Sequence, residues 1–210
     1  MKKWKKGYLI ILGVFLIFLG VSAIALSIMN KNYDQILWIC YDSLILIGIG
    51  CLIGNSYLIA SQLNILTLPI LIWNIDFFYV LITGNTLWGI TNYYFDTGFL
   101  NFSRFISLQH LVVIPLALYA LYTLKIKRKD AWKLSLIQIV LLFSIIYFFV
   151  PPTNNVNCIF KPCINYLIPY LNGIAYNIFW FVGYIIMILL TNFLLIKLFY
   201  VKITITREKV

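Results

Sequence analysis

The sequence predicts an all-α, polytopic membrane protein in which six transmembrane helices form one bundle. Of its 210 residues, 63% are hydrophobic and only 10% are charged, whereas soluble domains usually carry about 25% charged residues. Long apolar runs recur along the chain, each close to the ~20 residues that a helix needs to cross the hydrocarbon core. Basic residues concentrate in alternate connections between these runs. We therefore expect a single transmembrane domain over residues 1–210.

The six predicted spans account for most of the chain. They cover residues 8–29, 36–57, 63–83, 105–124, 132–150 and 174–199. A backbone inside lipid must satisfy its own hydrogen bonds, and barrel strands would be shorter and would alternate in polarity. These runs are therefore predicted to be helices. The connection over 56–64 is short, which makes the second and third spans a tight hairpin.

The distribution of the sixteen Lys and Arg residues predicts the orientation. Thirteen lie in the N-terminal segment, the fourth connection and the C-terminal segment: Lys2, Lys3, Lys5, Lys6, Lys125, Lys127, Arg128, Lys129, Lys133, Lys197, Lys202, Arg207 and Lys209. With six spans, these three regions share one side of the membrane. The positive-inside rule then places both termini in the cytoplasm, in a plasma membrane.

The net charge of +10 is explained by contacts between basic residues and anionic headgroups. We therefore predict membrane lipids as partners and no nucleic acid, and the sequence leaves the oligomeric state open. Cys158 and Cys163 lie in the fifth connection, on the predicted outer side, where they could form a disulfide or remain two unpaired thiols. No second Cys pair or nearby His completes a metal site, so no metal or cofactor is predicted.

Polar residues within the spans are costly in lipid and are therefore candidates for function. They concentrate in the predicted outer half: Cys40, Asp42 and Ser43 in the second span, Asp76 in the third, and Gln109 and His110 in the fourth. At ~1.5 Å per residue, Cys40 and His110 both lie about 6–8 Å below the outer boundary. Ser43 follows Cys40 by three residues and shares its face, whereas Asp42 points away.

A thiol beside an imidazole is a nucleophile–base pair that a carboxylate can orient. We assign these roles to Cys40, His110 and Asp76, respectively. The alternative is that Cys40 is a small apolar packing residue and His110 a hydrogen-bonding group between helices.

Two short segments resemble a known family. Residues 110–118 read His-Leu-Val-Val-Ile-Pro-Leu-Ala-Leu, and residues 38–46 read Trp-Ile-Cys-Tyr-Asp-Ser-Leu-Ile-Leu. The first resembles a helix of the androgen-induced fatty-acid-ester hydrolases and of bacterial, mollicute-type six-span relatives, in which a single His precedes a Pro. The second is similar to their Tyr-Phe-Thr-x-x-Ser-Asn-x-Leu motif, with Cys40 at the nucleophilic Thr and Leu44 in place of the Asn. The resemblance implies a six-helix bundle with an outward-opening cavity.

Two functions remain open from the sequence. The first is a lipid-ester hydrolase or acyl transferase in which Cys40 attacks, His110 relays the proton and Ser43 or Gln109 stabilises the oxyanion. The second is a non-enzymatic membrane protein, either a small carrier or a lipid- or partner-binding subunit, in which Asp42, Asp76 and His110 line a polar path or a helix interface. Against a carrier, the polar residues of the inner halves are interpreted as isolated: Gln138, Thr191 and Asn192.

Overall fold

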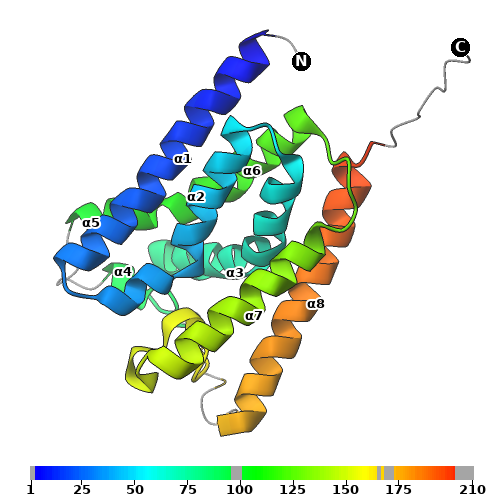
Figure 1. Ribbon diagram of the computed structural model, residues 1–210. Coiled ribbons are helices and arrows are strands. Elements are labelled where there is room, and N and C mark those ends of the chain that lie inside the picture. The colour runs from blue at the N-terminus through cyan, green and yellow to red at the C-terminus, as the bar shows by residue number, and fades with distance from the viewer. Residues whose placement is uncertain (1–2, 96–100, 165–166, 168–172, 202–210) are drawn as a thin grey trace, which may run out of the picture.

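The computed structural model describes residues 3–95, 101–164, 167 and 173–201, and these are mostly helical (Figure 1). The principal helices are α1 (Lys3–Met29), α2 (Ile39–Leu52), α3 (Ser56–Thr83), α6 (Gln109–Leu124), α7 (Ala131–Phe149) and α8 (Gly173–Phe199). The shorter ones are η1 (Tyr33–Leu37), α4 (Asn92–Phe95), α5 (Asn101–Ser107), η2 (Pro152–Asn154) and η3 (Val156–Cys158). The predicted all-α class is confirmed for the described residues.

Five helical stretches of the described chain are long and apolar enough to cross a membrane. They are Lys6–Met29, Ser56–Thr83, Phe102–Leu124, Ala131–Phe149 and Gly173–Phe199. Their length and composition are those of a multi-pass membrane protein. The predicted spans 8–29, 105–124, 132–150 and 174–199 each correspond to one of these stretches.

The predicted second span, 36–57, is not one long helix. The chain forms η1 and then α2, which has only 14 residues. At ~1.5 Å per residue α2 is about 21 Å long, shorter than the ~30 Å hydrocarbon core. Gly54 ends the segment with a φ of +67°, and the Asn55 side chain caps α3 by accepting from Tyr57 N and Leu58 N at 3.0 and 3.2 Å. The predicted connection 56–64 is therefore wrong, because α3 begins at Ser56.

Helices α1 and α2 pack with their backbones in close approach. A Cβ atom added to Gly13 would lie 2.8 Å from Gly48 O, and one added to Gly48 would lie 2.7 Å from Gly13 O. No larger residue fits at either position without separating the helices. Small residues at a crossing of this kind allow the tight packing that holds membrane helices together.

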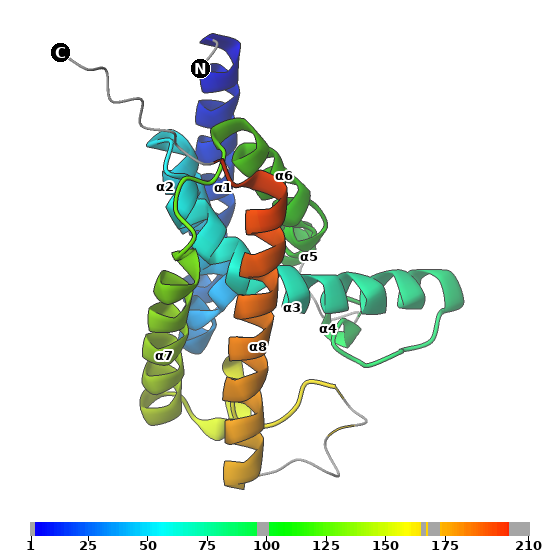
Figure 2. The same cartoon turned by 90° about the vertical axis from the view of Figure 1, so that its right-hand side faces the viewer.

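Helix α3 changes direction along its 28 residues. Figure 2 shows its first part running beside α7 and α8 and its later part running across α8. Pro69 lies inside the helix, where it removes a backbone hydrogen bond and favours a kink. The bend carries Trp73 and Asp76 away from the axis of the bundle and toward α4.

The start of α1, the connection between α6 and α7, and the end of α8 lie at one end of the molecule (Figure 1). Ile126 N donates to Phe199 O, and Val201 N donates to Ile126 O, both at 3.0 Å, which joins that connection to the end of α8. The described basic residues of the three regions, in the first turns of α1, in the connection between α6 and α7 and at Lys197 near the end of α8, therefore gather at this end. Lys2, Lys202, Arg207 and Lys209 lie outside the described residues. The connection that carries Cys158 and Cys163 lies at the opposite end.

Candidate functional site

Two adjoining cavities lie near the end opposite the termini, and they share Cys40, Trp73 and His110 in their walls. The first, about 500 Å³, is called here the polar cavity because its wall includes Ser27, Asn30, Gln35, Asn154 and Lys161. The second, about 260 Å³, is called the apolar cavity because its wall includes Leu66, Pro69, Ile70, Phe179, Trp180 and Met187. The polar cavity lies in the size range of small-molecule sites. The shared wall brings Cys40 and His110 to one hollow.

Cys40 is the second residue of α2, and a neighbouring loop holds this turn in place. Asn157 Oδ1 accepts a hydrogen bond from Ile39 N at 3.1 Å, and Asn157 Nδ2 donates to Leu37 O at 2.8 Å. The thiol is free and the residue is buried. Cys51 is also free and buried, but it lines neither cavity. The two thiols of α2 therefore lie in different surroundings.

His110 is the second residue of α6, just after the break between α5 and α6 at Leu108. Its Nδ1 lies 2.7 Å from Ser107 O. A carbonyl oxygen only accepts, so this contact requires the hydrogen on Nδ1 and leaves Nε2 as the proton acceptor. The imidazole also stacks on Trp73, with 4.6 Å between ring centroids. The ring is thus held in one tautomer and one orientation.

The Asp76 carboxylate bonds to the connection that follows α3, whereas the sequence predicted a bond to His110. Its carboxylate is fully buried and accepts from Trp88 N at 2.7 Å, Thr91 N at 2.8 Å and Thr91 Oγ1 at 2.7 Å. It lines neither cavity. The carboxylate therefore organises the connection after α3. The Ser107 carbonyl, not Asp76, holds the imidazole of His110.

The three supporting residues also lie outside the two cavities. The Ser43 hydroxyl donates to Gln62 Oε1 at 2.9 Å, away from Cys40 although both residues are on α2. Gln109 is buried, and within the described residues neither of its amide atoms has a hydrogen-bond partner. Asp42 is half-buried. None of the three contributes to the walls around Cys40, and the described residues contain no cluster of three His, Cys, Asp or Glu side chains suited to a metal ion.

A second polar group was missed from the sequence, and we call it the inner network. Its members are Ser43, Ser61, Gln62, Asn64, Ser135, Gln138 and Asn192, on α2, α3, α7 and α8. Gln62 Nε2 donates to Gln138 Oε1 at 2.9 Å, and Asn64 Nδ2 donates to Asn192 Oδ1 at 3.2 Å. The interpretation of Gln138 and Asn192 as isolated is therefore wrong. The signal was available, because Gln62 and Asn64 belong to α3 once Asn55 is recognised as its cap.

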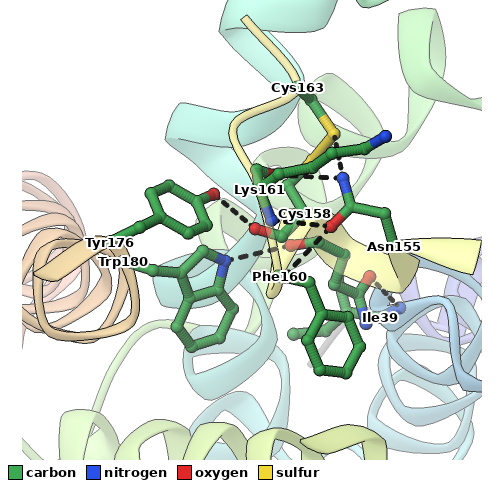
Figure 3. The surroundings of a disulfide bond; sticks show 9 residues. Ile39, Asn155, Cys158, Phe160, Lys161, Cys163, Tyr176 and Trp180 are labelled. Carbon is green, nitrogen blue, oxygen red and sulfur yellow. Dashed lines mark hydrogen bonds between the residues drawn. A yellow bond between two sulfur atoms is a disulfide. The ribbon is translucent and has the colours of Figure 1, made fainter. Parts of the chain in front are cut away.

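Cys158 and Cys163 are joined by a disulfide with 5.5 Å between their Cα atoms, within the range that an unstrained bridge needs (Figure 3). Residues 155–163, called here the disulfide loop, are held further by Asn155, whose Oδ1 accepts from Phe160 N and Lys161 N at 3.0 Å. Trp180 Nε1 donates to Asn157 O at 3.0 Å, which fastens the loop to α8. Both cysteines contribute to both cavities, so the loop is a fixed part of their walls.

No family model, curated protein or solved structure matches the chain. The resemblance of residues 38–46 and 110–118 to the androgen-induced fatty-acid-ester hydrolases therefore stays a prediction. Its two key residues, Cys40 and His110, lie on different helices, and both line the two cavities.

Proposed function

We propose that the protein is a membrane enzyme that cleaves or transfers the acyl group of a lipid ester, with Cys40 as the nucleophile and His110 as the base. One observation carries this proposal. Cys40 and the single His of the chain line the same two cavities, one whose wall includes several polar side chains and one whose wall is almost entirely apolar. An ester bond of a lipid lies between its polar headgroup and its acyl chain. A lipid that occupies both cavities would therefore present its ester to the shared wall.

The proposed chemistry needs no residue beyond this pair to balance. Nε2 of His110 takes the proton of the Cys40 thiol as the sulfur attacks the ester carbonyl carbon. The C–O bond breaks, and the imidazolium returns the proton to the leaving alkoxide. A thioester on Cys40 remains, which water or a second alcohol resolves with His110 again as the base. In the neutral ring, the contact with the Ser107 carbonyl places the hydrogen on Nδ1 and leaves Nε2 available to accept the proton.

We further propose that the chain crosses the membrane six times, with η1 and α2 together making the second crossing. The basic residues at the end that carries the start of α1 and the end of α8 support a cytoplasmic position for that end. The disulfide at the opposite end supports an oxidising exterior there. The apolar cavity has an exposed Phe179 in its wall, which supports entry of the substrate sideways from the lipid.

A lipid-binding protein without catalytic activity is the second candidate. The observation that favours it is the engagement of Asp76 by Trp88 and Thr91, which leaves His110 without a carboxylate partner among the described residues. In that case the cavities would hold a lipid and Cys40 would only fill space.

Hydrolysis of a fluorogenic long-chain ester by purified, detergent-solubilised protein separates the two candidates. We expect turnover and an acyl adduct on Cys40, detected by mass spectrometry of the intact protein. Cys40→Ala should reduce the rate to background, whereas Cys51→Ala, the matched control on the same helix, should retain it. Cys40→Thr should keep part of the activity if the family resemblance is meaningful. Equal rates for Cys40→Ala and wild type would leave the lipid-binding protein as the better description.

A further inference from the structure

The charge in the wall of the polar cavity indicates which lipids fit there. Among the described residues of that wall, Lys161 is the only one with a permanent charge, and no carboxylate is included. The other polar side chains are amides, hydroxyls, the indoles of Trp38 and Trp73, the Cys40 thiol and the His110 imidazole. A lone cation beside a hollow with low-dielectric walls favours an anionic group in that hollow.

Lys161 is held at this wall by its backbone. Asn155 Oδ1 accepts from Lys161 N, and Asn155 Nδ2 donates to Lys161 O, both at 3.0 Å. The disulfide closes the same short loop, and Pro162 next to Lys161 is buried. Figure 3 shows the Lys161 side chain extending past the disulfide and over Asn155. The disulfide loop therefore fixes the backbone from which the Lys161 side chain extends at the cavity wall.

The cavity also has a rim and a floor. Asn30, Gln35, Asn154 and Lys161 are exposed, whereas Cys40 and Trp73 are buried. The amides add hydrogen-bond donors to the cation at the rim. The carboxylate of Asp34 accepts a hydrogen bond from the rim residue Asn154 but does not line the cavity. A headgroup at the rim thus meets donors, while the ester and chain lie below it.

We propose that the two cavities take an anionic amphiphile, with its phosphate or carboxylate at Lys161 and its acyl chain in the apolar cavity. This inference rests on the proposed function only in placing the lipid in the cavities that Cys40 and His110 line. Binding does not require the thiol. A neutral or zwitterionic lipid of the same chain length should bind more weakly.

Binding is measured with Cys40→Ala protein in a neutral detergent, so that no turnover occurs. The probes are phosphatidylglycerol and phosphatidylcholine with identical brominated chains, whose bromines quench the fluorescence of Trp38 and Trp73 in the shared wall. We expect phosphatidylglycerol to bind about tenfold more tightly, as one charge-assisted contact predicts. Lys161→Gln should remove the preference and Lys161→Arg should keep it. Lys31→Gln, which removes a charge outside the cavity, should leave it unchanged.

Glycerol phosphate and inorganic phosphate, added as soluble competitors at millimolar concentration, distinguish a lipid from a free anion. Displacement of the brominated lipid by either one would show a free-anion site and overturn the proposal. So would equal affinity for the two lipids, or loss of the preference in Lys31→Gln. If the preference depends on Lys161 but the wild-type protein hydrolyses no ester, the inference stands and only the catalytic function fails.

Discussion

The inner network and the polar cavity use polar side chains in opposite ways, and helix α2 contributes to both. In the inner network, Gln62 bonds to Ser43 on α2 and to Gln138 on α7, and also to its neighbour Ser61, so its amide joins three helices. Around the polar cavity, the Cys40 thiol and the imidazole face a hollow. The contrast is sharpest on α2, where Cys40 lines the cavity and Ser43, one turn later, belongs to the network. Polar residues one turn apart on one helix can therefore have separate roles, one bonded between helices and one lining a cavity.

The largest effect on stability is expected where the network is densest. Gln62→Leu removes the three side-chain hydrogen bonds of Gln62 and leaves Ser43 and Gln138 without these partners. Two of these bonds join different helices and contribute about 0.6 kcal/mol each, and the buried Ser43 hydroxyl is left without its partner, so the free energy of unfolding should fall by about 2 kcal/mol in all. Reversible unfolding in mixed micelles measures this change.

A substitution in the cavity wall, Cys40→Ala, is the control for the stability of Gln62→Leu. Cys40→Ala deletes one thiol at the edge of a hollow and should leave the unfolding free energy almost unchanged. If Cys40→Ala destabilises the protein as much as Gln62→Leu does, the division between a structural network and a chemical cavity is wrong.

A smaller loss of stability is expected at Asp76. This residue lies at the end of the molecule that holds the cavities, but its carboxylate is fully hydrogen-bonded, as the side chain of Gln62 is. Asp76→Asn weakens the bonds from Trp88 N and from Thr91 and should cost about 1.5 kcal/mol in unfolding free energy. Loss of a triad carboxylate lowers kcat about 10⁴-fold in serine proteases, whereas here we expect a change within about threefold. Ester hydrolysis followed from pH 5 to pH 9 gives the comparison.

Wild type and Asp76→Asn should show the same dependence of kcat on pH, because the imidazole of His110 contacts the Ser107 carbonyl and not Asp76. A fall in kcat of several orders of magnitude would restore Asp76 to the role of orienting group. Thr91→Val, which removes only the hydroxyl donor to Asp76, is the matched control for disturbance of the loop.

The helical class and five of the long helices follow from hydropathy, because lipid requires long apolar segments with internal hydrogen bonds. The helix ends do not follow from it. Gly54 and Asn55 end one helix and cap the next, yet this polar interruption is only Gly-Asn-Ser long and has apolar residues on both sides, so average hydropathy does not mark it as a helix end. The bend of α3 could not be predicted from hydropathy either. Proline is tolerated in membrane helices, and the effect of Pro69 depends on the packing around it.

For the site, the predicted depth of each residue in its span placed Cys40 and His110 beside one cavity. The same reasoning also placed Asp76, Ser43, Gln109 and Asp42 there, and these four line neither cavity. Depth places Asp76 near His110, but the loop that returns to bind Asp76 comes from residues 88–91, which no periodicity predicts. The three-residue spacing puts Ser43 on the same face of α2 as Cys40. That face is wide enough for Ser43 to contact α3 while Cys40 lines the cavity. The side-chain partners across helices decide the role, and they depend on the tertiary packing.

The smallest expected change is an increase in the free energy of unfolding. It comes from comparing the same substitution, Gln to Leu, at a paired and at an unpaired glutamine. Gln109 and Gln62 are both buried, but Gln109 lines no cavity and neither amide atom has a partner among the described residues. An unpaired buried amide has lost its contacts with water and gained none, so an apolar side chain of similar size should be better there. Gln109→Leu should therefore raise the unfolding free energy by about 1 kcal/mol, whereas the same change at Gln62 lowers it. Unfolding of both variants in the same micelles provides the measurement. Loss of stability in Gln109→Leu would show that this amide is paired in the membrane and belongs with the network.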